Sequence, residues 1–164
     1  MLFMESAITI SQQSSIKKVW QLLEGIADPE IPVLSVLDLG IVRSVGFNNE
    51  NKLQVIITPT YSGCPAMDII SINIRLTLAS AGFKDFEVKQ TLNPPWTTDW
   101  MTESGKEKLR SYGIAPPKKN DEMPACPQCK SIHTKLLSQF GSTACKALYQ
   151  CDDCREPFDY FKCH

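Results

Sequence analysis

Four cysteines near the end of the chain carry the clearest chemical signal. They stand in two Cys-x-x-Cys pairs, CPQC and CDDC, with 21 residues between the pairs. Each two-residue gap allows a tight turn that directs both sulfurs at one point, and two such turns give the tetrahedron of thiolates that suits Zn²⁺. The predicted ligands of a structural zinc ion are Cys126, Cys129, Cys151 and Cys154.

Other readings of this cluster stay open at the level of sequence. A rubredoxin-like iron site uses the same four sulfurs. Unligated cysteines or disulfides are less favoured, because the first residues lack the basic start of a secretory signal, which indicates a reducing cytoplasm. Further candidate ligands are Cys145, Cys163, His133 and His164. We expect Cys145 to be a core thiol, His133 to lie in a strand and His164 to be solvated.

The segment after residue 122 is only about 40 residues long, which is too short to sustain a core of its own. Metal binding supplies on the order of 10–16 kcal/mol in such modules. We therefore expect the metal to hold together hairpins near residues 131–138 and 144–150. The aromatic residues of this segment are expected to pack the ribbon or to meet a partner protein rather than nucleic-acid bases; they are Phe140, Tyr149, Phe158, Tyr160 and Phe161.

Cys64 lies apart from the pairs, in the segment TPTYSGCPAMD at residues 58–68. If Pro65 is the first helical residue, Cys64 is the N-cap, and unpaired backbone N–H groups of the first turn face its sulfur. That position lowers the pKa of a thiol. We therefore expect an exposed thiolate that a metal or partner can approach past Ser62 and Gly63. The alternative is a buried cysteine that packs as a small hydrophobic residue.

The elements that must position Cys64 follow from hydrophobic periodicity. An amphipathic helix is predicted over residues 14–26, capped by Ser14 or Ser15. A hairpin is predicted from strands 41–47 and 52–58 around the turn NNEN. The hairpin residues expected to share one buried face are Leu53, Val55 and Ile57.

Residues 66–81 fit two patterns. Their isoleucines and leucines alternate with polar residues, as in a strand, but Pro65 stands where a helix begins and Gly82 where one ends. We predict a helix here, then a strand over 84–92 and a short helix near 102–111. Trp96 and Trp100 are expected to fix the last helix to the core.

The bulk composition narrows the class of protein. The chain has 164 residues, 43% hydrophobic content and a net charge of −1 that is spread evenly along it. Nucleic-acid binding needs clustered Lys and Arg, and a membrane span needs roughly 20 apolar residues, so we expect neither partner. The sequence predicts a cytoplasmic α/β (α+β) protein. It would comprise a domain at 1–113 with helices on one sheet, a linker at 114–124, and a zinc ribbon at 125–164.

Two motifs of the first domain resemble a known family. DPEIPVLSVLDLGIV followed by TPTYSGCPAMD is similar to the MIP-eighteen/SufT type of domain, which is linked to iron–sulfur assembly. The resemblance covers roughly residues 14–95 and implies a small α/β sandwich. It also implies that Cys64 is the functional cysteine, with Asp38, Thr58 and Thr60 as matching site residues. Glu30 falls in the acidic-Pro-Glu segment of the pattern.

The tail resembles a narrower family. PWTTDWMTESGKEKLRSYGIAPP and FGSTACKALYQCDDCREPFDYFKCH are similar to the D subunits (PaaD or PaaJ) of phenylacetyl-CoA epoxidase, the ring-epoxidising system of aerobic phenylacetate breakdown. The resemblance implies a cytoplasmic accessory protein whose partners are the oxygenase and reductase subunits. One departure is Lys130, which stands after the first knuckle where such ribbons often have glycine.

The leading hypothesis from sequence is a non-catalytic assembly factor. Cys64, helped by Asp38, would hold iron or an iron–sulfur species transiently, while the ribbon docks the client. A homodimer would bring two Cys64 residues together. The alternative is a structural or electron-transfer subunit of the epoxidase complex.

Overall fold

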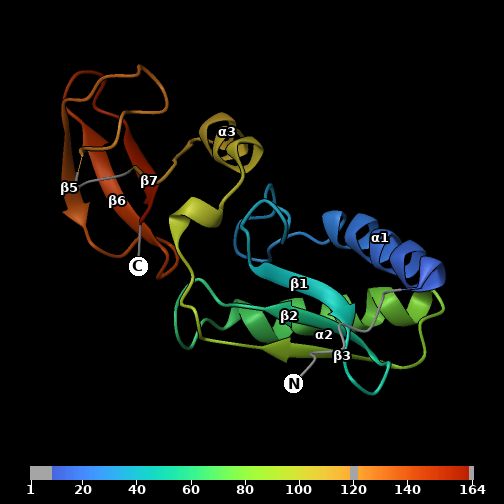
Figure 1. Ribbon diagram of the computed structural model, residues 1–164. Coiled ribbons are helices and arrows are strands. Elements are labelled where there is room, and N and C mark those ends of the chain that lie inside the picture. The colour runs from blue at the N-terminus through green and yellow to red at the C-terminus, as the bar shows by residue number, and fades with distance from the viewer. Residues whose placement is uncertain (1–8, 119–121, 163–164) are drawn as a thin grey trace, which may run out of the picture.

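The computed structural model describes residues 9–118 and 122–162, which form two sheets with three helices (Figure 1). The elements of the first part are α1 Ile10–Glu24, β1 Val42–Phe47, β2 Leu53–Ile57, α2 Ala66–Ser80, β3 Phe86–Gln90, the 3₁₀ turn η1 Thr98–Trp100 and α3 Glu103–Tyr112. Those of the second part are β4 Ile114–Ala115, β5 Thr134–Ser138, β6 Lys146–Cys151 and β7 Pro157–Phe161. Each helix of the described residues is too short or too polar to cross a bilayer.

The first sheet has the strand order β1-β2-β3 and confirms the predicted hairpin. Strands β1 and β2 are antiparallel, whereas β2 and β3 are parallel. A parallel pair needs a crossover connection, and α2 provides it. Helices α1 and α2 pack against each other and against this sheet. The predicted inward residues of β2 are all buried: Leu53, Val55 and Ile57.

Helix α1 begins earlier than the sequence pattern predicts. Thr9 is its N-cap, and Thr9 and Gln12 form a reciprocal capping box. This arrangement satisfies two N–H groups of the first turn. The prediction that Ser14 or Ser15 caps the helix is therefore wrong, and both serines lie within it. The end of the helix at Gly25 is as predicted.

Two tryptophans fix the loop before α3 to the core, as predicted. Trp96 is buried and donates a hydrogen bond from Nε1 to the Leu39 carbonyl at 2.9 Å. Trp100 lies against Gly40, whose φ is +67°, and a Cβ at that glycine would lie 2.1 Å from the Trp100 carbonyl oxygen. The Arg43 guanidinium covers the Trp100 ring, 3.4 Å from its centroid.

The second sheet forms the ribbon and has the order β4-β7-β6-β5 (Figure 1). The segments near residues 131–138 and 144–150 were predicted as hairpins, but each holds a single strand, β5 and β6, and the two pair as one antiparallel hairpin. Strand β7 adds to β6. The residues Ile114 and Ala115, predicted as linker, form β4 and pair in parallel with β7.

The two sheets share buried side chains. Phe161 of β7 and Cys145, which precedes β6, belong to the core of the first sheet and its helices. Phe161 meets Trp96 edge to face, with ring centroids 6.2 Å apart. The ribbon therefore packs on the first part of the chain. The predicted packing role of its aromatics holds for Tyr149, Phe158 and Tyr160, while Phe140 is exposed.

Candidate functional site

The four predicted zinc ligands converge at one end of the ribbon. Their sulfurs all lie within 4.8 Å of one another, and no other group of three or more potential ligands does so in residues 9–118 and 122–162. Cys126 and Cys151 are buried, Cys154 is half-buried and Cys129 is exposed. The cluster therefore has an inner side in the ribbon core and an outer side in solvent.

Each pair of ligands is presented by a tight turn. The Lys130 N–H donates to the Cys126 carbonyl at 2.9 Å, and the Arg155 N–H donates to the Cys151 carbonyl at 3.0 Å. Lys130 and Arg155 have φ values of 66° and 67°. This left-handed conformation explains why ribbons often have glycine after the knuckle. Lys130 adopts it, so the departure from glycine does not prevent the turn.

The sulfur geometry fits a tetrahedral zinc ion. Zinc–sulfur bonds of about 2.3 Å place neighbouring sulfurs about 3.8 Å apart. The observed separations are 3.6 Å for Cys126–Cys154 and 3.5 Å for Cys129–Cys151. Backbone N–H groups of Cys154 and Asp153 lower the pKa of Cys151 to about 7, against the effect of burial, which favours the thiolate that zinc requires.

The other candidate zinc ligands have different surroundings. His133 Nδ1 lies 3.2 Å from an Asp153 carboxylate oxygen, and the ring is exposed. Cys145 is buried in the core, as predicted. Cys163 and His164 lie outside the described residues.

Cys64 lies immediately before the start of α2. Pro65 already has helical torsion angles, φ −67° and ψ −23°, although the first α-helical residue is Ala66. The Cys64 N–H donates to the Tyr61 carbonyl at 3.3 Å, and Gly63 supplies the positive φ of +80° that this tight turn needs. The half-buried thiol borders a surface hollow of about 390 Å³. Cys64 is therefore half-buried and close to a helix start, but Pro65 is the N-cap, so the predicted N-cap position of Cys64 is wrong by one residue.

The protonation of Cys64 differs from the sequence prediction. Burial raises the pKa of this thiol, and the negative charges of Glu30 and Asp28 raise it further. Hydrogen bonds from the Ala66 N–H and the Tyr61 hydroxyl act in the opposite direction but are outweighed. The expected exposed thiolate with a lowered pKa is therefore wrong, because neighbouring carboxylates and desolvation exceed the effect of the helix start. A bound cation would reverse this balance by neutralising the same carboxylates.

Glu30 is held toward this region by a turn that Asp28 organises. The Asp28 Oδ1 accepts hydrogen bonds from the Glu30 N–H at 2.8 Å and the Ile31 N–H at 2.7 Å. Asp28 is buried, and burial raises its pKa despite these bonds. The acidic-Pro-Glu segment therefore forms a hydrogen-bonded turn that carries Glu30, a role the sequence left undefined.

Thr58 and Thr60 flank Pro59 at the end of β2. Thr58 is completely buried, and its hydroxyl has no hydrogen-bond partner among the described residues. Thr60 is half-buried. The two residues begin the loop that carries Cys64, so these three predicted site residues share one continuous segment of the chain.

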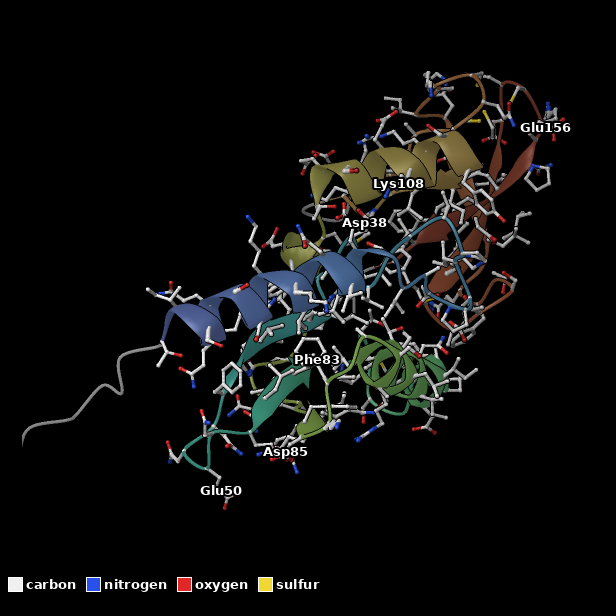
Figure 2. The ribbon with its side chains drawn as sticks, turned by 90° about the vertical axis from the view of Figure 1, so that its right-hand side faces the viewer. Asp38, Glu50, Phe83, Asp85, Lys108 and Glu156 are labelled. Atoms are coloured by element: carbon white, nitrogen blue, oxygen red, sulfur yellow. The ribbon has the colours of Figure 1, made fainter. Side chains whose placement is uncertain are left out.

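The sequence suggested that Asp38 assists Cys64, but its bonding partners lie in its own loop and at α3. Its Oδ2 lies 2.6 Å from the Lys108 ammonium and accepts from the Ser35 N–H, while Oδ1 accepts from the Thr102 hydroxyl. Asp38 faces Lys108 of α3 (Figure 2). Burial alone would raise the pKa of Asp38, but the bonds from Lys108 and Ser35 outweigh it and hold that pKa below its ordinary value. The carboxylates that influence Cys64 are instead those of Glu30 and Asp28.

Known proteins resemble the chain in the same two parts. Residues 16–89 match the family of iron-sulfur cluster assembly proteins, and residues 115–162 match the PaaD zinc beta ribbon domain. The crystal structure of a DUF59 domain from Bacillus anthracis, of unknown function, is 29% identical with a TM-score of 0.55, over 60% of this chain and 94% of that one. A Bacillus subtilis protein named Fe-S protein maturation auxiliary factor YitW is 36% identical, over 53% of this chain and 85% of its own length.

Fold and site together define a protein with an iron–sulfur assembly type of domain and a four-cysteine zinc ribbon. An Escherichia coli (strain K12) protein assigned as the D subunit of 1,2-phenylacetyl-CoA epoxidase is 52% identical, over 90% of this chain and 93% of its own length. This match spans both parts. The chain belongs to the family of D subunits of phenylacetyl-CoA epoxidase, which confirms the resemblance drawn from sequence.

Proposed function

We propose that the protein is a non-catalytic accessory component of a phenylacetyl-CoA epoxidase and assists assembly of an iron or iron–sulfur centre in its oxygenase or reductase partners. The observation that carries this proposal is the position of Cys64. Its thiol borders an open hollow, beside a helix start and within reach of the charges on Glu30 and Asp28. A thiol that must exchange a metal with a client protein has to be reachable from solvent.

The residues of the site have separate roles in this proposal. Cys64 binds iron or an iron–sulfur species transiently, losing its proton as the metal binds. The charges of Glu30 and Asp28 favour a cation over a free thiolate. Thr58 and Thr60 shape the loop, and Asp38 fixes the neighbouring loop to α3. The zinc ribbon keeps its own shape through a resident metal and docks the client.

A reconstitution of the epoxidase tests this function. The other epoxidase subunits are produced with the wild-type chain, with Cys64→Ala or with the control Ser62→Ala, an exposed neighbour on the same loop. Epoxidation of phenylacetyl-CoA and the iron content of each partner are measured.

We expect Cys64→Ala to fold normally and to leave the partners low in iron and activity, whereas Ser62→Ala behaves as wild type. Full iron content and full activity with Cys64→Ala would contradict the role. Full iron content with low activity would favour a structural or electron-transfer subunit instead.

A further inference from the structure

Helix α2 carries large apolar side chains on two opposite faces. Its inner face is buried in the core of the first sheet, with Ile70 and Ile74 at most 1% exposed. On the outer face Ile69, Ile72 and Leu76 are 50%, 54% and 61% exposed. A surface helix normally combines a buried apolar face with a polar outer face. The apolar outer face of α2 therefore indicates an interaction surface.

The spacing of these exposed side chains is that of a coiled-coil seam. Ile69, Ile72 and Leu76 follow one another at intervals of three and four residues, so Ile69 and Leu76 take a positions and Ile72 a d position. The outer stripe of α2 consists of these three residues together with Pro65 and Ala79, which are exposed and continue the same spacing. A stripe of this kind fits the apolar seam of a second helix.

Two exposed charges on one flank of the outer stripe indicate which helix it fits. Asp68 and Arg75 each stand immediately before an a position, so both occupy g positions. In an antiparallel helix pair the g positions of the two helices face each other. Pairing centred on Ile72 therefore sets Asp68 of each copy beside Arg75 of the other. A parallel pair would set the two charges beside Asn73 and Ser80, which are neutral.

We propose that the outer stripe of α2 pairs antiparallel with α2 of a second copy of the chain, around a two-fold axis at Ile72. The stripe is complementary to itself about that axis, since Ile69 of one copy meets Leu76 of the other and Ile72 meets its equivalent. Contacts of this isologous type close at two copies. The net charge of each copy is only −1, so overall repulsion between the copies is small.

The size of the outer stripe indicates a dimer that dissociates readily. Its three large side chains, each exposed by half or more, leave on the order of 300 Å² of apolar surface per copy. A standard stable interface buries about 800 Å² per partner. Arg75 also donates to the Val88 carbonyl at 2.9 Å, and its five N–H donors allow a second partner. Exposed pairs of Asp68 with Arg75 set the orientation more than the affinity.

The antiparallel arrangement places the two Cys64 loops at opposite ends of the helix pair. Cys64 precedes Ile72 by two helical turns' worth of chain. At a rise of 1.5 Å per residue, the two thiols lie roughly 24 Å apart along the helix axes. This homodimer therefore does not share a metal between two Cys64 residues, in contrast to the hypothesis from sequence. Each Cys64 keeps its own hollow and serves its own client.

Sedimentation of the full, zinc-loaded chain over a range of concentrations tests this interface. The wild type is expected to pass reversibly from monomer to dimer. Ile72→Glu sets two carboxylates face to face at the two-fold axis and should raise the dissociation constant at least tenfold. Leu137→Glu is the matched control, because Leu137 of ribbon strand β5 is also 50% exposed, and it should dimerise like wild type. Circular dichroism verifies that each variant is folded.

Exchange of the flanking charges tests the orientation. Asp68→Arg alone and Arg75→Asp alone each set like charges together, so each should weaken dimerisation several-fold. An equimolar mixture of the two variants pairs opposite charges at both ends and should form a mixed dimer about as tight as the wild-type dimer. Folded single variants that dimerise like wild type, or that gain nothing from mixing, would overturn the antiparallel orientation.

Two other outcomes would overturn the interface itself. One is a wild type that stays monomeric even at about 0.5 mM, where an association of millimolar affinity or tighter is detectable. The other is a dimer that Leu137→Glu disrupts and Ile72→Glu does not, which would place the contact on the ribbon. Cys64 is unchanged in every variant, so failure of the dimer leaves the proposed function untouched, and failure of the Cys64→Ala test leaves the dimer untouched.

Discussion

At the scale of single residues, Asp38 is the side chain whose role the structure redefines most. It joins the Ser35 loop to α3 through Thr102 and Lys108. We predict that Asp38→Asn lowers the free energy of unfolding near pH 7 by about 1–3 kcal/mol, because a buried carboxylate with several donors is lost. Urea denaturation of both proteins measures this difference.

The pH dependence of that difference has a defined sign. The folded-state pKa of Asp38 lies below 3.8, so its charge stabilises the fold above about pH 4 and ceases to do so as the pH falls through the folded-state value. The gap between wild type and Asp38→Asn should therefore narrow in acid. Asp85→Asn is the control, because its ion pair with Lys52 is largely exposed and should contribute under about 1 kcal/mol. If Asp38→Asn lowered the free energy of unfolding as little as Asp85→Asn does, the proposed structural role of Asp38 would be contradicted.

Thr58 offers a test that separates function from stability. Its buried hydroxyl has no partner among the described residues, so Thr58→Val should leave the free energy of unfolding unchanged or raise it by about 1 kcal/mol. Thr134→Val is the matched control, because the Thr134 hydroxyl donates to the Pro124 carbonyl at 2.8 Å and its loss should cost about 1–2 kcal/mol.

Both stabilities are measured by denaturant unfolding of the zinc-loaded chain. A Thr58→Val variant with wild-type stability but reduced epoxidase support would show that the hydroxyl serves the Cys64 loop. A destabilised variant would mean that Thr58 has a structural partner.

The residues of the site were predictable from sequence to different degrees. The four ribbon cysteines follow from spacing alone, because each turn is local and brings its own two sulfurs together. The protonation of Cys64 could not be predicted, since Glu30 and Asp28 reach it only through the tertiary fold. The contact of Glu30 with Cys145 joins positions 115 residues apart, and no local pattern encodes it.

At the scale of elements, the loop at residues 37–41 is controlled by one close approach. Gly40 has a left-handed φ of +67°, and its missing side chain leaves room for the Trp100 carbonyl. Gly40→Ala should lower the free energy of unfolding by about 2–4 kcal/mol, from backbone strain together with overpacking. Gly46→Ala in β1 is the control, because nothing lies within 4 Å of its new Cβ, and it should change stability by less than about 0.5 kcal/mol. Thermal unfolding distinguishes the two variants. Equal melting temperatures would show that η1 can shift to accommodate the added methyl group without loss of stability.

The elements themselves were largely predictable, and the exceptions have physical causes. In α2 the apolar residues alternate as in a strand, yet Ile70, Ile74 and Leu78 are buried while Ile72 and Leu76 are exposed. The helix that we predicted from Pro65 and Gly82 at the two ends of the segment is therefore confirmed. Strand β4 was missed because two residues carry no periodicity, and only pairing with β7 makes them a strand.

At the scale of the whole molecule, we expect the ribbon to need its metal in order to fold and the first part to fold without it. The four-cysteine cluster lies among a small set of buried residues, Ala115, Cys126, Cys151 and Phe158, which is too few to hold three strands without zinc. The first part, by contrast, has its own sheet, helices and extensive core. The Bacillus anthracis domain is matched over 94% of its length by 60% of this chain. The solved chain therefore has this type of fold without an added ribbon.

We therefore predict that a strong chelator melts the ribbon and leaves the first sheet folded. Amide hydrogen exchange should show loss of protection in β5, β6 and β7, while β1, β2 and β3 stay protected because their pairing and their helices involve no zinc ligand. Trp96 fluorescence should change as well, because Phe161 leaves its ring. Zinc added back should restore the ribbon signals, and Cys64→Ala carrying zinc should exchange like wild type throughout. If chelation instead unfolded both sheets together, the shared contacts at Trp96 and Cys145 would bind the chain into one cooperative unit, and the metal would control the Cys64 loop directly.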